Sequence, residues 1–127
     1  MDNFKQTRLH PDILKAITKM GFETPTPIQA KTIPHLMASA HDLIATAQTG
    51  TGKTAAFGLP SIHLTDIEDR RTQTLVLCPT RELCMQITKD LANFSKYIIG
   101  MNILAVYGGA SIQSQIKSLK KGAQIVI

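Results

Sequence analysis

The sequence of 127 residues predicts one α/β domain, in which helices cover both faces of a parallel sheet. Three observations lead to this prediction. Apolar, strand-like runs alternate with amphipathic, helix-like runs along the chain. The run "TLVLC" at Thr74–Cys78 is continuously apolar, which is typical of a strand buried on both faces. The connections between the runs are short. Apolar residues make up 43% and charged residues 18% of the chain, which is an ordinary globular composition and argues against disorder.

The N-terminal third predicts two helices. The first runs from Pro11 to Met20 and stops at Gly21, and its apolar face carries Ile13, Leu14, Ile17 and Met20. The second starts at Thr26-Pro27, with Ile28, Ile33, Leu36 and Met37 as its apolar stripe. We expect Pro34 to bend or split the second helix, because proline cannot donate a helical hydrogen bond.

The middle of the chain predicts a strand, a loop and a helix, followed by a buried strand. Asp42–Thr46 is the first short strand, and a helix starts at Lys53 and is disturbed at Pro60. Glu68–Thr72 is a charged surface loop. It separates this helix from the apolar strand Thr74–Cys78.

The last third continues the alternation. A helix is predicted over Arg81–Ile98, a strand over Ile103–Tyr107, a helix over Ser111–Lys121 and a final strand over Gln124–Ile127. The inward positions of the two helices are Leu83, Ile87, Leu91, Phe94 and Ile98 in the first, and Ile112, Ile116 and Leu119 in the second. Because the chain stops inside an apolar strand, we expect the sheet to be incomplete at its C-terminus.

The loop "AQTGTGKT" lies between the first strand and the helix that starts at Lys53. Glycines let backbone N–H groups curl around a phosphate, and the following helix N-terminus favours an anion. A lysine can reach the outer phosphates, and a neighbouring hydroxyl can hold Mg²⁺. Ala47 stands where a strict P-loop has glycine, which is tolerable wherever φ stays negative. The alternative is a glycine-rich turn with an incidental lysine.

A second stretch, "GFETPTPIQ", could serve the same nucleotide. The amide of Gln29 has a donor and an acceptor, so it can pair with the edge of adenine. The alternative is that Thr-Pro is simply a helix start and Gln29 a solvated side chain.

Bulk properties narrow the function classes. The net charge of +5 permits a polyanionic partner without requiring one. The chain has no run of about 18 apolar residues and no apolar signal core, so we expect a cytoplasmic protein that does not span a membrane. Cys78 and Cys84 fit no metal-binding spacing, and we expect two reduced thiols.

Taken together, the motifs resemble the DEAD-box ATP-dependent RNA helicases. The order is Phe4, seventeen positions before Gly21, then "GFETPTPIQ", "AQTGTGKT", "PTREL" at Pro79–Leu83 and "GG" at Gly108-Gly109. The resemblance covers essentially the whole chain, and Ala47 is the usual form in that family. It implies a P-loop NTPase fold of the RecA-like type and an enzyme that uses ATP and Mg²⁺.

The resemblance also implies the roles of single residues. Phe4 would pack on adenine, Gln29 would read its edge, Lys53 would contact the β- and γ-phosphates, and Thr54 would hold Mg²⁺. The nucleotide-binding set is then Phe4, Gln29, Ala47, Gln48, Thr49, Gly50, Thr51, Gly52, Lys53 and Thr54, with Lys53 and Thr54 also catalytic. The set facing the RNA backbone is Pro79, Thr80, Arg81, Gly108 and Gly109.

These roles divide the chain into segments. Residues 1–30 recognise adenine, residues 42–54 form a strand and the P-loop, and residues 74–127 form the RNA-facing strand–helix units. Since ligands gather at the C-terminal ends of parallel strands, the P-loop, Thr80-Arg81 and Gly108-Gly109 should share one edge. Backbone contacts imply sequence-tolerant binding of single-stranded or duplex RNA.

One departure from the family limits the expected activity. Hydrolysis needs a carboxylate for Mg²⁺ and a group that positions water, which the family supplies in an Asp-Glu-Ala-Asp segment that is absent here. The acidic stretch Asp66–Asp69 reads as a solvated loop. A fragment that is inactive alone, within an active helicase, is therefore one hypothesis. A non-catalytic nucleotide- or RNA-binding module is the alternative, and another P-loop enzyme such as a nucleotide kinase is a remote third.

Overall fold

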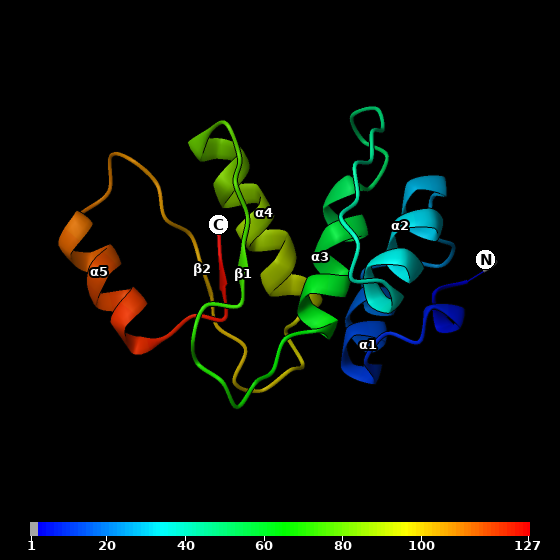
Figure 1. The fold of residues 1–127 in the computed structure, drawn as a ribbon, viewed down its shortest axis with the longest axis horizontal. Helices are drawn as coiled ribbons and strands as arrows, with labels where there is room; N and C mark the ends of the chain where they lie inside the picture. Colours follow the sequence, from blue (N-terminus) through cyan, green and yellow to red (C-terminus); the bar gives the residue numbers. More distant parts are fainter. Residues whose placement is uncertain (1–2) are drawn as a thin grey trace.

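A computed structural model describes residues 3–127 (Figure 1). The short 3-10 helix η1 (Phe4–Thr7) precedes three helices, and strands then alternate with helices to the end of the chain. These later elements are α1 (Pro11–Lys19), α2 (Pro27–Ala38), α3 (Lys53–His63), β1 (Thr74–Leu75), α4 (Arg81–Phe94), β2 (Ile103–Leu104), α5 (Ile112–Lys121) and β3 (Ile125–Val126). Among these described residues, no helix combines the length and apolarity needed to cross a membrane.

The sheet is parallel, with β3 between β1 and β2. Ile125 is in register with Thr74 on one side and with Ile103 on the other. As the central strand, β3 is buried on both faces. The α/β architecture with a parallel sheet, predicted from the alternation of apolar runs, is confirmed.

The helix boundaries follow local signals. His10 caps α1, whose first residue is Pro11, and Gly21 has a φ of +84° just after its end. Thr26 and Gln29 form a capping box at the start of α2. Of the two predicted effects of Pro34, the split is wrong, because α2 continues through this exposed proline to Ala38. α3 likewise runs through Pro60 without a break.

One core joins the helices to the sheet. Ile13 and Ile17 of α1, Ile33 of α2, Leu59 of α3 and Leu91 of α4 are fully buried. The predicted inward faces of the first, second and fourth helices are therefore largely confirmed, although α4 ends at Phe94 rather than at Ile98.

The predicted strand at Asp42–Thr46 is wrong. The segment has no regular secondary structure and pairs with no strand among the described residues, and Ile44 is 95% exposed. A strand is defined by its ladder of hydrogen bonds, and no described strand lies beside this segment to supply one.

The prediction that Thr74–Cys78 is buried on both faces is also wrong. Leu75 and Leu77 are 65% and 85% exposed, whereas Val76 and Cys78 are half-buried. Leu75 and Leu77 point to the same face of the strand, and no described element covers that face.

The predicted inward face of α5 is exposed. Ile112, Ile116 and Leu119 lie on one side of the helix, yet they are 71%, 46% and 40% exposed. In Figure 1, α5 lies at one end of the molecule, away from the other helices. The helical period was predicted correctly, but the packing surface that it implies is not present among the described residues.

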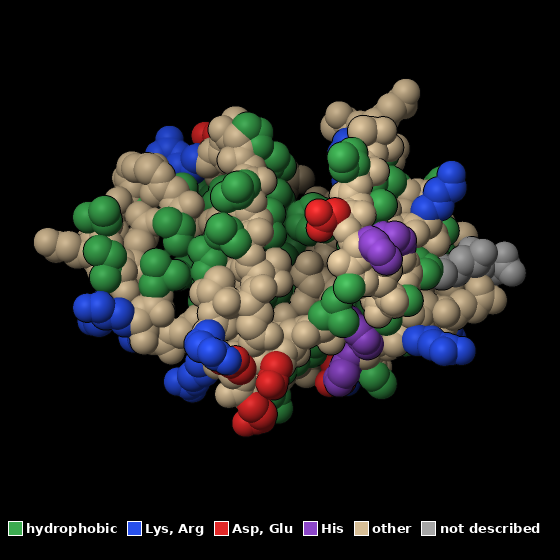
Figure 2. Space-filling view, in the orientation of Figure 1, with side chains coloured by type: hydrophobic (Ala, Val, Ile, Leu, Met, Phe, Trp, Pro, Cys, Tyr) green, Lys and Arg blue, Asp and Glu red, His purple; other side chains and the backbone are tan. Residues whose placement is uncertain are grey.

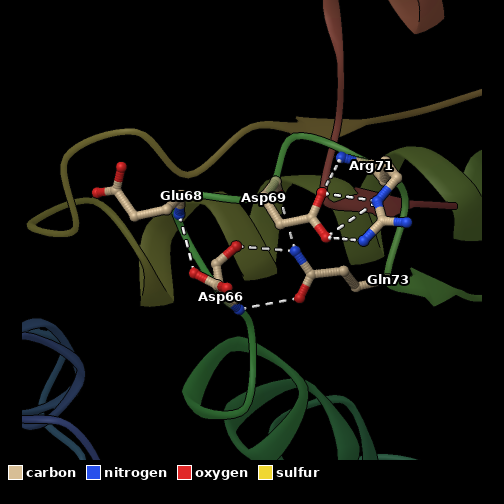
Figure 3. A network of polar contacts seen from close by, with 5 residues as sticks. All are labelled: Asp66, Glu68, Asp69, Arg71 and Gln73. Carbon is tan, nitrogen blue, oxygen red and sulfur yellow. Dashed lines mark hydrogen bonds and ion pairs between the residues drawn. The ribbon is translucent and has the colours of Figure 1, made fainter.

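The predicted charged loop is confirmed and is held by its own side chains (Figure 3). The Gln73 amide accepts from the Asp66 N–H and donates to the Asp66 and Asp69 carbonyls at 2.8–2.9 Å. Arg71 donates three hydrogen bonds to the Asp69 carboxylate. Hydrogen bonding to Arg71 lowers the pKa of Asp69 to about 2. Asp66 and Asp69 thus serve the loop, which supports the interpretation of this acidic stretch as structural.

Candidate functional site

The glycine-rich loop precedes the N-terminus of α3. Gly50 and Gly52 have φ values of +79° and +84°, a left-handed conformation that favours glycine. Gly52 is the N-cap residue of α3, and no side chain caps the helix. The first N–H groups of α3 are therefore left without a side-chain acceptor, as an anion-binding helix start requires.

Lys53 lies over this loop. Its ammonium nitrogen is 2.5 Å from the carbonyl oxygen of Ala47, six residues earlier. The hydroxyl of Thr51 donates to the carbonyl of Gln48 at 2.6 Å. The loop is thus closed on itself, with a cation held against its own backbone. A phosphate that replaced the Ala47 carbonyl as acceptor would meet an ammonium group already in place, so the loop fits a phosphorylated ligand.

The start of α2 is joined to the same loop. The Thr26 hydroxyl donates to the Thr51 carbonyl at 2.8 Å, and the Gln29 amide donates to the Gly52 carbonyl at 3.1 Å. The Gln29 amide oxygen accepts from the Thr26 N–H at 2.9 Å. Gln29 is only 3% exposed, so it is not the solvated side chain of the alternative interpretation. Both ends of its amide are engaged inside the protein, and its role in reading adenine stays a prediction.

Phe4 lies in the core next to this region. Its side chain is 4% exposed, and its ring centroid is 5.9 Å from that of Phe22, which in turn is 5.9 Å from Phe94. Through this ring contact, the N-terminal segment packs against Phe22, the first residue of the stretch "FETPTPIQ". Stacking of Phe4 on a base stays a prediction.

Two further loops meet at the C-terminal ends of the strands. Thr80 caps α4 by accepting from the Leu83 N–H at 3.2 Å. The Arg81 guanidinium reaches the carbonyl of Gly108, at 3.5 Å, in the loop after β2. Gly109 has a φ of +89°, and a Cβ atom there would lie 2.7 Å from the Arg81 Nη1 atom. The structure therefore brings Thr80, Arg81, Gly108 and Gly109 together, and Pro79, Thr80 and Arg81 are all exposed.

A polar side chain that the sequence did not single out holds one of these loops. The amide of Gln115, on α5, accepts from the Tyr107 N–H at 3.0 Å and donates to the carbonyls of Tyr107 and Ala110 at 3.1 and 3.4 Å. These contacts bracket Gly108-Gly109. Thr26 was missed in the same way, because a hydroxyl that bonds to a backbone carbonyl 25 residues away leaves no sequence signal.

A groove of about 610 Å³ separates the glycine-rich loop from the strands. Lys53 and Thr54 line it on one side, and Val76–Pro79 on the other. In Figure 2 this region is a hollow with hydrophobic side chains along it. Pro79 borders this groove, whereas Thr80, Arg81 and Gly108 line a separate pocket of about 240 Å³. Within the described part of the chain, no group of three or more His, Cys, Asp or Glu side chains could hold a metal ion.

A parallel sheet, with a glycine-rich loop that opens a helix and presents a lysine, defines a P-loop protein of the α/β class. The family model described as "DEAD/DEAH box helicase" matches residues 26–127, and the chain belongs to this family. The resemblance seen in the sequence is thereby confirmed.

Named relatives and solved structures agree. The ATP-dependent RNA helicase CshA of Listeria monocytogenes is 51% identical over 127 residues, which is 100% of this chain and 24% of CshA. The crystal structure of a DEAD box protein from Methanococcus jannaschii has a TM-score of 0.93 and 39% identity, over 100% of this chain and 34% of that one. Dbp5 of S. cerevisiae, bound to RNA and ADP BeF3, has a TM-score of 0.83 and 28% identity, over 100% and 32%. The RecA-like fold is confirmed, and the chain spans about a quarter of CshA.

Proposed function

We propose that this chain is the nucleotide-binding and RNA-facing part of an ATP-dependent RNA helicase. In the whole protein, ATP hydrolysis would be coupled to the separation of short RNA duplexes. The observation that carries the proposal is the glycine-rich loop at the uncapped N-terminus of α3, with the Lys53 ammonium group held over it. Residues 42–54 would bind the phosphates, residues 1–30 the adenine and residues 74–127 the RNA.

The phosphates would lie in the loop formed by Ala47, Gln48, Thr49, Gly50, Thr51 and Gly52. Lys53 would exchange the Ala47 carbonyl for the β- and γ-phosphates, because a charged acceptor forms the stronger hydrogen bond. The Thr54 hydroxyl, one residue into α3, would hold Mg²⁺ together with the phosphate oxygens. ATP–Mg²⁺ supplies the phosphoryl group that is transferred to water.

Adenine recognition would use Gln29 and Phe4. The Gln29 amide is already bonded to Gly52, so it lies at the edge of the phosphate loop, where a bound nucleotide would present its base. Reading the base would require this amide to exchange a protein partner for adenine. Stacking by Phe4 would require η1 to shift, since Phe4 is almost fully buried.

RNA would contact the edge formed by Pro79, Thr80, Arg81, Gly108 and Gly109. The Arg81 guanidinium lies between the two loops and can donate to a phosphate group from there. Gly109 has no side chain that could hinder a sugar-phosphate strand. Dbp5, which shares this fold, has been solved bound to RNA. Such contacts read the backbone, so binding would tolerate different sequences.

The second candidate is a non-catalytic binding module. It is favoured by the acidic residues: Asp66 and Asp69 are engaged in their own loop, and the described residues contain no cluster of metal-ligating side chains. In this case the chain would bind nucleotide or RNA without hydrolysis. Both candidates would act in the cytoplasm, where Cys78 and Cys84, which are free in the structure, stay reduced.

Steady-state ATPase assays of the full-length protein, with and without single-stranded RNA, test the proposal. We expect RNA to stimulate turnover and the Lys53→Ala variant to lose it together with nucleotide affinity. Tight ATP binding with no ADP formed, with or without RNA, would favour the binding module. Undiminished ATP affinity in Lys53→Ala would show that the loop is not the phosphate site.

A further inference from the structure

Three lysines, two on α1 and one just after α4, lie around one tyrosine. Lys15 and Lys19 lie on α1, and Lys96 and Tyr97 directly follow α4. The three ammonium nitrogens are 4.4, 5.3 and 5.1 Å from the centroid of the Tyr97 ring. We call these four residues the lysine cluster. All three lysines are exposed, and Tyr97 is half-buried.

The lysine cluster is a concentration of positive charge with no carboxylate in contact. The ion pairs found within residues 3–127 are His10–Asp12 and Arg71–Asp69, and neither includes a cluster lysine. Because each nitrogen is close to the same ring, any two of them are within roughly 10 Å, about one Debye length at 0.1 M salt. Hydrogen bonding to Lys19, together with the other nearby ammonium charges, lowers the pKa of Tyr97. An anion bound here would relieve the mutual repulsion.

The cluster is separate from the RNA-facing edge. Arg81 begins α4 at that edge, and Lys96 and Tyr97 follow the other end of the helix. A helix of 14 residues is about 21 Å long at 1.5 Å per residue. One phosphate group therefore cannot contact Arg81 and the cluster at the same time, whereas a longer strand can.

We propose that the lysine cluster is a second RNA-contacting site, which binds phosphate groups of an RNA that also occupies the edge at Arg81. The proposal rests on the proposed function and adds a surface to it. Lysine binds phosphate groups as a point charge, which needs no bidentate geometry. An RNA that occupies the edge at Arg81 can carry phosphate groups along α4 to the cluster, and this continuity favours RNA over a separate acidic peptide. The Tyr97 ring adds a surface for a sugar or base.

The test is RNA binding by the full-length protein in which Lys15, Lys19 and Lys96 are changed to Gln. The probe is a fluorescent poly-uridine strand long enough to reach both sites, titrated at several salt concentrations. Log affinity falls as log salt rises, and loss of three phosphate contacts should make this negative slope shallower by about two. Binding at low salt should be about tenfold weaker. An RNA strand that is too short to extend from the edge at Arg81 to the lysine cluster should bind the variant and the unchanged protein with the same affinity.

The matched control changes Lys5, Lys31 and Arg70 to Gln, which removes the same charge from exposed positions outside the cluster and outside residues 74–127. This control should leave affinity for the long strand within about twofold, because it removes no proposed phosphate contact. Equal losses in the two variants would show an effect of net charge alone and would overturn the proposal. An unchanged salt slope in the cluster variant would overturn it too.

Three further outcomes separate this proposal from the proposed function. If the unchanged protein binds the short strand and the cluster variant binds both strands normally, only the lysine cluster is refuted. If polyglutamate binds in a cluster-dependent way while RNA binding is unaffected, the surface serves an acidic protein instead. If the unchanged protein binds neither strand, the proposed function itself fails.

Discussion

Replacement of Gln29 by Ala tests how the start of α2 controls the phosphate loop. The change removes the hydrogen bond to the Gly52 carbonyl and the acceptor of the Thr26 N–H, at a site that is 3% exposed. Each lost bond between buried groups costs about 1 kcal/mol, and the groups left without partners add to this, so we expect a loss of roughly 2–3 kcal/mol. For a chain of this length, that loss lowers the melting temperature by roughly 7–11 °C.

Thermal unfolding followed by circular dichroism measures this loss, and titrations with ATP and GTP measure the second role of the residue. If Gln29 reads adenine, the Ala variant loses its preference for ATP over GTP. If Gln29 acts only by holding the loop, affinities for both nucleotides fall in parallel. Gln29→Glu is the matched control, since it keeps the acceptor for Thr26 and loses the donor to Gly52. An unchanged melting temperature in Gln29→Ala would refute the structural reasoning.

Three other predictions follow from single contacts. Burial, and then the charge of His10, lowers the pKa of His63 below its usual 6.5, and the His63 Nδ1 atom accepts the His10 N–H. Folding therefore favours the neutral form of His63, which adds to the free energy of unfolding above about pH 6.5. This contribution is lost as the pH falls through the lower pKa of the folded state. Thermal melts at pH 7.5 and 5.5 should show the loss, and the difference between the two melting temperatures should be smaller in His63→Asn. Gly52→Ala should weaken ATP binding at least tenfold in a titration, because the new Cβ would lie 2.3 Å from the Gln29 amide nitrogen and the φ is left-handed; unchanged affinity would contradict this. Gln115→Leu should weaken RNA binding about tenfold with ATP affinity unchanged, because it frees the loop at Gly108-Gly109; equal losses of both affinities would instead indicate general unfolding.

The helices could be predicted because their signals are local. Proline at the first position and a capping residue before it act within a few residues and locate the starts of α1 and α2, and Gly21 locates the end of α1. The glycine-rich loop before α3 was predictable for the same reason, since its glycines, its lysine and the helix are contiguous. The contact of Arg81 with Gly108 followed from a general rule about parallel sheets.

The strands were predicted less well because a strand depends on its neighbours. The apolar run at Thr74–Cys78 reads as buried on both faces, but no described element covers the face that carries Leu75 and Leu77. The stripe of Ile112, Ile116 and Leu119 has the right period and no surface to pack against. The sequence pattern indicates which side chains favour burial, but the tertiary arrangement decides whether they are buried.

The contacts of the phosphate loop make nucleotide binding and the packing of α2 interdependent. The Thr51 and Gly52 carbonyls accept from Thr26 and Gln29, and the Ala47 carbonyl accepts from Lys53. Because the C=O and N–H groups of a trans peptide point in opposite directions, the bonds to Thr26 and Gln29 orient the N–H groups of Gly52 and Lys53 away from these two side chains. The start of α2 therefore helps to hold the conformation in which a bound phosphate would meet these N–H groups. If Gln29 also contacts adenine, as we propose, base and phosphates would act on one side chain, and this would include a helix start 23 residues before Gly52 in the site.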